Sequence, residues 1–261
     1  MDLNLPGKHA VVGGASRGIG RASAIELAAN GAEVTLVARH EGALQEVLAL
    51  LDTSAGQSHR YLCGDSSQPQ KLAASVAEIA ATRAVNILVN NTGGPPDGPA
   101  HSAPLDAYVL AFTQHVLCSQ ALLQAVLPGM RDSGYGRIIN VISTSVKQPI
   151  PGLGVSNTIR GGVASWAKTL ASELGPDGIT VNNILPGFTE TRRLDEVIES
   201  RASKAGTSIA EMAQVLRQTV PLGRFGRAEE TAAAVAFLAS PAAAYINGIN
   251  LPVDGGRTGS L

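Results

Sequence analysis

The sequence is poor in aromatic residues, in cysteine and in net charge. Aromatic side chains make up 3% of its 261 residues, so recognition of nucleic-acid bases by stacking on rings is not expected. The formal net charge is -1 and lysines and arginines form no cluster, which argues against nucleic acid and anionic membranes as partners. These absences leave a small molecule as the expected partner.

The two cysteines, Cys63 and Cys118, lie in apolar contexts and have no metal-ligand spacing. Both are expected to be small buried hydrophobic residues, which suits a reducing cytoplasm. The N-terminal residues run directly into a strand pattern, and no uninterrupted apolar run is long enough to span a bilayer. A cytoplasmic protein without a membrane anchor is therefore expected.

Short apolar runs alternate with longer helical patterns along the whole chain. Strands are expected at 9–13, 33–38, 60–63, 87–90, 137–142, 180–185 and 248–253, and helices at 19–30, 41–51, 71–82, 106–130, 154–174 and 228–239. This alternation predicts an α/β fold, a doubly wound parallel sheet with helices on both faces. The chain is 44% hydrophobic, enough for one sizeable core, so a single domain over 1–261 is expected.

The stretch 188–222 is too long to be a simple loop in a compact domain. Apolar residues recur there at helical spacing on both sides of a Gly-Thr-Ser break, at Leu194, Val197 and Ile198 and then at Ile209, Met212, Val215 and Leu216. Two short amphipathic helices are expected, and they are interpreted as a lid insert over a cleft.

A glycine-rich turn follows the first strand and opens the first helix. Gly14 permits a tight turn, Gly18 lets the backbone approach a pyrophosphate, and Gly20 lets the helix pack close to the sheet. The order strand, glycine turn, helix predicts dinucleotide binding much more strongly than a lone glycine motif does. Three further turn residues are predicted to line the cofactor, namely Ser16, Arg17 and Ile19.

The end of the second strand lacks the acid that an NAD-selective site places on the ribose hydroxyls. The sequence there reads Val-Ala-Arg39-His40. Arg39 and Arg17 together could form a fork around a 2′-phosphate, a geometry that guanidinium groups suit. NADP(H) is therefore expected in preference to NAD(H), and the alternative is that both arginines are simply solvated.

The turn spacing Gly-x-x-x-Gly-x-Gly and the motifs that follow resemble the short-chain dehydrogenases/reductases and, in overall pattern, their ketoacyl-reductase branch. Asn90-Asn91-Thr92-Gly93 resembles that family's Asn-Asn-Ala-Gly, and the stretch from Pro186 to Thr191 resembles its Pro-Gly motif. Val253-Asp254-Gly255-Gly256 is similar to the end of its C-terminal strand. The resemblance covers nearly the whole chain and implies a Rossmann fold.

The resemblance also implies roles for residues that line the cofactor. Asp65 would contact the adenine, and Asn91 and Gly93 would line the cofactor. Pro186 and Gly187 would contact the nicotinamide through their backbone, with the Thr191 hydroxyl near the carboxamide or the phosphates. A homotetramer or a homodimer is implied as well, formed through the helices at 106–130 and 154–174 and the C-terminal strand.

In this family a Tyr hydroxyl exchanges the proton, a Lys four residues later lowers its pKa, a Ser orients the carbonyl, and an Asn supports a proton relay. Counting from Ser143, the Tyr position falls on Ser156 and the Lys position on Arg160. The Asn position falls on His115. Only the Ser of these four is retained, so the chain resembles a divergent member that lacks the Tyr-x-x-x-Lys pair.

The three replacements differ in what they can do. An aliphatic hydroxyl is a far weaker acid than a phenol, so Ser156 cannot simply take the place of Tyr. Arg160 cannot donate a proton at neutral pH, yet it could bind the nicotinamide ribose or a substrate oxyanion, or it could face solvent. His115 would titrate near neutrality and join a relay with Ser143 and Ser156, or it could be an ordinary core residue.

Two functions remain open at this point. One is an NADP(H)-dependent oxidoreductase that reduces a carbonyl or oxidises an alcohol on an apolar substrate, through an atypical proton-delivery site. The other is an NADP(H)-binding protein without hydride chemistry that acts as a sensor or scaffold. No metal site is expected.

Overall fold

Within residues 1–260, which the computed structural model describes, seven parallel strands form one sheet in the order β3-β2-β1-β4-β5-β6-β7. The strands are β1 (His9–Gly13), β2 (Glu33–Ala38), β3 (Arg60–Cys63), β4 (Ile87–Asn90), β5 (Gly136–Val141), β6 (Ile179–Pro186) and β7 (Asn250–Val253). The order changes direction between β1 and β4. That change is the topological switch point of a doubly wound sheet.

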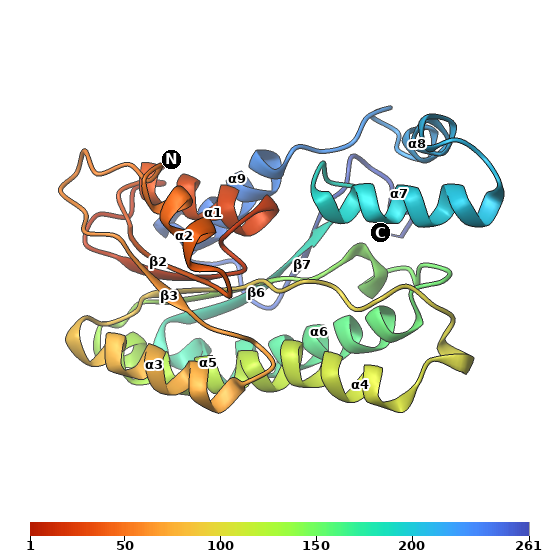
Figure 1. Ribbon diagram of the computed structural model, residues 1–261. Coiled ribbons are helices and arrows are strands. Elements are labelled where there is room, and N and C mark those ends of the chain that lie inside the picture. Colours follow the sequence, from red (N-terminus) through yellow and green to blue (C-terminus); the bar gives the residue numbers. More distant parts are fainter. Residues whose placement is uncertain (261) are drawn as a thin grey trace.

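Helices cover both faces of the sheet (Figure 1). One layer contains α1 (Gly18–Ala29), α2 (Glu41–Leu48) and α9 (Ala228–Ala239), and the other contains α3 (Pro69–Thr82), α4 (Leu105–Phe112), α5 (Cys118–Asp132) and α6 (Gly154–Leu174). Neighbouring residues of β1 point to opposite layers, since Val12 packs in the core of the first and Val11 in that of the second. Burial on both faces explains why the strands are apolar throughout, and the predicted α/β fold is confirmed.

A row of asparagines, of which three are buried and Asn250 is half-buried, crosses four neighbouring strands. Asn90, Asn140, Asn183 and Asn250 lie in register on β4 to β7. Each side-chain Nδ2 donates to the Oδ1 of the next asparagine, at 2.9, 2.9 and 2.8 Å in turn. The amides thereby pair with one another inside the sheet, although Asn90 Oδ1 at one end of the row has no partner within residues 1–260. A slip of one strand by one residue would break the row.

The helix predicted at 106–130 is continuous but not uniform. A π-helical turn, Thr113–Leu117, separates α4 from α5, and His115 lies in it. By length and composition Leu105–Asp132 could cross a membrane, which was not expected from the sequence. However, α5 packs beneath the sheet with Leu123 and Val126 in the core, as the core helix of a globular domain does.

The prediction for the cysteines is wrong for one of them. Cys63 is exposed because it ends β3, an edge strand of the sheet. Cys118 is buried, and burial, followed by the charge of Asp65, raises the pKa of its thiol to about 11. Cys118 is therefore a protonated packing residue at neutral pH.

Two helices, α7 (Arg192–Ala205) and α8 (Ile209–Gln218), extend beyond the carboxyl ends of the strands (Figure 1). Gly206 ends α7 in the left-handed region with a φ of +66°, and Ser208 caps α8 through its Oγ, which accepts from the Glu211 amide at 3.2 Å. The pair has a small core of its own, which includes Leu194, Ile198, Leu216 and Phe225. Both helices predicted within 188–222 are present.

Candidate active site

A cleft of about 760 Å³ opens at the carboxyl ends of the central strands, where open α/β sheets bind ligands. It brings together nearly all of the predicted site residues. Its lining includes Gly14, Ser16, Arg17, Gly18, Ile19, Arg39, Asp65, Asn91, Gly93, His115, Ser143, Ser156, Arg160, Pro186, Gly187 and Thr191. Gly20 is the exception, because it is buried behind the glycine turn.

The glycine turn is built around close backbone contacts. Gly14 and Gly18 have φ values of +59° and +54°, which side chains rarely tolerate. A Cβ at Gly14 would lie 2.6 Å from Asn91 Nδ2, and a Cβ at Gly20 would collide with the Gly14 carbonyl oxygen. Asn91 Nδ2 also donates to the Gly13 carbonyl at 3.1 Å, so β4 braces the turn and leaves the N-terminus of α1 facing the cleft.

The opposite wall of this end comes from the segment after β6. Gly187 packs against the residue that follows β7, since a Cβ there would lie 2.7 Å from Asp254 Cα. Thr191 Cγ2 lies 3.1 Å from the position that a Cβ on Gly18 would occupy. The Pro-Gly segment and the glycine turn therefore face each other across the cleft.

Two arginines lie at the outer end of the cleft. Arg17 and Arg39 are exposed and line it, and neither makes a salt bridge within residues 1–260. Asp65 lies on the same wall, and its pKa is lowered mainly by the Ser67 amide, which donates to its carboxylate at 2.9 Å. Both guanidinium groups are thus available to an anion.

Ser143, Ser156 and Arg160 lie at the inner end. Ser143 follows β5, and its Oγ accepts from the Ser145 amide at 3.1 Å. Ser156 is buried in the first turn of α6, and Arg160 lies one turn further on. Arg160 Nη1 donates to the Val141 carbonyl at 2.8 Å, which holds the arginine against the end of β5.

Arg160 is 7% exposed, so it does not face solvent. In the part of the chain that the structure describes, no carboxylate lies within salt-bridge distance of it, and its Nε has no hydrogen-bond partner. Burial, followed by the charge of Arg193, lowers its pKa to about 10. The group therefore stays positively charged at neutral pH.

His115 is 4% exposed, and its Nδ1 lies 2.8 Å from Thr92 Oγ1. Burial, followed by the charge of Arg160, lowers its pKa to about 2. The expectation that His115 titrates near neutrality is wrong, because a buried imidazole beside a cation stays neutral. Among residues 1–260 its side-chain partner is Thr92, and no hydrogen bond joins it to either serine of the expected relay.

The cleft is more cationic than the sequence suggested. Arg192, Arg193, Arg201 and Arg257 line it together with Arg160, and Arg193 is close enough to Arg160 to affect its pKa. The acidic residues among the lining are Asp65 and Glu196. The lining therefore combines arginines from α6, α7 and the C-terminal segment with apolar side chains such as Ile142, Leu153 and Val163.

Arg193 also connects the two rims of the cleft. Its Nη2 lies 2.6 Å from Asp97 Oδ1 and donates to the Pro95 carbonyl at 3.1 Å. These contacts tie α7 to the loop after β4. No role in the site was predicted for Thr92, Arg193 or Asp97. Two adjacent arginines at the start of an amphipathic helix were a signal in the sequence for Arg193.

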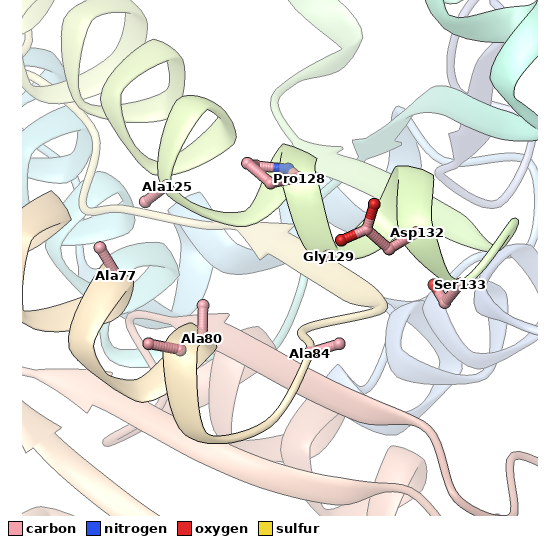
Figure 2. A pocket seen from close by; sticks show the side chains of 9 residues that line it. Ala77, Ala80, Ala84, Ala125, Pro128, Gly129, Asp132 and Ser133 are labelled. Carbon is pink, nitrogen blue, oxygen red and sulfur yellow. The ribbon is translucent and has the colours of Figure 1, made fainter.

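A second cavity, of about 540 Å³, lies between α3 and α5 (Figure 2). Small side chains line it, with one carboxylate at its end, namely Ala77, Ala80, Ala81, Ala84, Ala125, Pro128, Gly129, Asp132 and Ser133. Across residues 1–260, no group of three or more His, Cys, Asp or Glu is placed to hold a metal ion. The cleft at the strand ends is therefore the candidate active site.

Known proteins resemble this chain over nearly its full length. The family model described as Enoyl-(Acyl carrier protein) reductase matches residues 14–258. The short-chain reductase protein NovJ of Streptomyces niveus is 35% identical over 251 residues, covering 95% of this chain and 93% of NovJ. The 3-oxoacyl-[acyl-carrier-protein] reductase FabG of Vibrio cholerae is 36% identical over 255 residues, with coverages of 97% and 98%.

Solved structures agree with the sequence relatives. L-sorbose reductase from Gluconobacter frateurii, complexed with NADPH and L-sorbose, superposes with a TM-score of 0.93 at 31% identity and covers 100% of both chains. The order of the motifs, the doubly wound sheet and the matched length all support membership of one family. The chain belongs to the short-chain dehydrogenase/reductase family.

Proposed function

We propose that this protein is an NADP(H)-dependent oxidoreductase that reduces a carbonyl, or runs the reverse alcohol oxidation, with an atypical proton-delivery site. One observation carries the proposal: a single cleft joins a glycine turn flanked by unpaired arginines to Ser143 at the end of β5. Its relatives include 3-oxoacyl reductases and an NADPH-bound sugar reductase, which supports the same chemistry.

The residues of the cleft fit NADP(H). The glycine turn, whose positive φ values at Gly14 and Gly18 favour glycine, would present the N-terminus of α1 to a pyrophosphate, and Arg17 with Arg39 would hold the 2′-phosphate. The remaining cofactor contacts are assigned to Ser16, Ile19, Asp65, Asn91, Gly93, Pro186, Gly187 and Thr191, with Gly20 packing the helix behind them. NADPH, when bound, supplies a hydride to the carbonyl carbon.

The protein's own side chains act on the substrate oxygen. The Ser143 hydroxyl would donate a hydrogen bond to it, with Ser156 as a second hydroxyl beside it, and the charge of Arg160 would stabilise the negative charge that develops. His115 is neutral and therefore offers no imidazolium proton, so we propose that water donates the proton to the oxygen and is left as hydroxide. Absence of a positioned general acid costs about 10² to 10⁴ in rate, so slow turnover is expected.

The chain would form one domain over 1–261, with the segment 188–222 as a lid. Arg193 supports this interpretation, because its contacts with Asp97 and Pro95 join α7 to the far rim. The exposed apolar side chains of α4, including Leu105 at 83% and Val109 at 66%, support a homodimer or homotetramer in which a second copy covers them. We also propose that the protein acts in the cytoplasm.

Oxidation of NADPH measured over a broad panel of carbonyl compounds tests this function. We expect turnover with at least one compound and a loss of about 10²-fold or more in Ser143→Ala, with NADPH affinity unchanged. Ser165→Ala, at an exposed serine of α6 outside the cleft, is the matched control. NADPH binding without turnover on any compound would instead favour the sensor or scaffold alternative.

A further inference from the structure

The buried guanidinium of Arg160 is a charge that the protein itself leaves unmatched. Its Nη1 donates to the Val141 carbonyl, and within residues 1–260 its buried Nε has no partner. A buried cation normally has a carboxylate beside it, because a charge removed from water without a counter-charge is strongly unfavourable. Such a residue points to a ligand that supplies the missing negative charge.

The surroundings of Arg160 increase this imbalance. Arg193 adds a second positive charge, although its own ion pair with Asp97 partly neutralises it. His115, on the other side, is neutral at physiological pH. Arg257 also lines the cleft, where its guanidinium lies over the Phe188 ring and its buried Nε has no hydrogen-bond partner within residues 1–260.

We propose that the substrate is a carbonyl compound that carries a carboxylate, and that Arg160 binds this carboxylate. The inference rests on the proposed function and names the substrate class of the same cleft. A guanidinium presents parallel N–H donors that match the two oxygens of a carboxylate. In an oxo acid the carboxylate and the reacting carbonyl lie close together. Arg160 is held against the Val141 carbonyl, two residues before Ser143, so the two side chains can each hold one of these groups.

The cofactor does not supply the negative charge that Arg160 lacks. The ribose hydroxyls that an inner-end residue would contact are neutral, whereas the charged groups of NADP(H) are its phosphates. Arg17, Arg39 and the glycine turn at the other end of the cleft serve those phosphates. The positive charge of Arg160 is therefore assigned to the substrate.

Binding to the protein saturated with NADP⁺ tests the inference without requiring turnover. Calorimetric titrations would compare a series of short 2-oxo, 3-oxo and 4-oxo acids with their methyl esters. We expect at least one acid to bind about 10- to 100-fold more tightly than its ester, the range for hydrogen bonds to a charged group. In Arg160→Met the acid should lose this advantage while the ester binds as before, and Arg160→Lys should keep part of it.

Arg21→Met, at an exposed arginine of α1 outside the cleft, is the matched control and should keep the full preference for the acid. Thermal unfolding of each variant verifies that it is folded. The inference is overturned if no acid binds, if acids and esters bind equally, or if Arg160→Met weakens NADP⁺ binding and leaves the acid preference intact. These outcomes are distinct from failure of the proposed function, which would appear as acid binding without NADPH oxidation.

Discussion

Replacement of His115 by Asn should make the stability of the protein less sensitive to acid. The pKa of His115 is lowered from 6.5 to about 2 in the folded protein. Below pH 6.5 the unfolded chain therefore takes up a proton at this residue, whereas the folded protein does not. Stability from this group is fully present above pH 6.5 and is lost as the pH falls toward 2.

The size of the effect follows from the two pKa values. A pH of 5 lies 1.5 units below the pKa of 6.5 of the unfolded histidine. At 1.36 kcal/mol per unit, this residue lowers the free energy of unfolding by about 2 kcal/mol between pH 8 and pH 5. His9, whose pKa is lowered to about 4, also lowers the free energy of unfolding as the pH falls, and this contribution is the same in the variant and the wild type. The free energy of unfolding of His115→Asn should therefore fall about 2 kcal/mol less than that of the wild type between pH 8 and pH 5.

Urea denaturation at the two pH values measures this difference, with His101→Asn, at an exposed histidine, as the control for the substitution itself. Equal pH dependence in the wild type and His115→Asn would refute the reasoning. So would a ring of His115 that titrates between pH 5 and pH 8 in NMR spectra, because the residue could then donate the proton in catalysis.

Three further predictions follow from the cleft and the sheet. Arg39→Ala should weaken NADPH binding about tenfold or more while leaving NADH binding nearly unchanged, as measured by fluorescence titration of both cofactors. Asn140→Leu should lower the free energy of unfolding by about 2–4 kcal/mol in urea, because it leaves buried amides of its neighbours without partners. The double change Ser156→Tyr with Arg160→Lys should raise the rate of NADPH oxidation by about 10² to 10⁴, because it restores an acidic hydroxyl and a cation at the spacing of the family. An unchanged rate would show that proton delivery does not limit turnover.

The sheet was predictable because its strands are short apolar runs buried on both faces. β1, β2, β3 and β4 begin and end at the residues expected. The glycine turn was equally clear, since Gly14, Gly18 and Gly20 each meet a local steric demand that the spacing reveals. These features depend on residues that are close together in the chain, so the sequence pattern was sufficient to predict them.

Features that depend on distant parts of the chain were not predictable in the same way. The low pKa of His115 arises from burial beside Arg160, which comes from another helix. The lining of the cleft brings together Arg160, Arg193 and Arg257 from segments far apart in sequence. Cys63 is exposed because β3 lies at an edge of the sheet, a consequence of strand order and not of its neighbours in the chain.

Transfer of deuterium tests the proposed hydride chemistry most directly. The protein would be incubated with carbonyl compounds and NADPH that carries deuterium at both C4 positions of the nicotinamide, and the products would be examined by mass spectrometry. Hydride transfer in this cleft predicts one deuterium on the former carbonyl carbon of a product, and a loss of about 10²-fold or more in Ser143→Ala. NADPH binding with no deuterium in any product would contradict it.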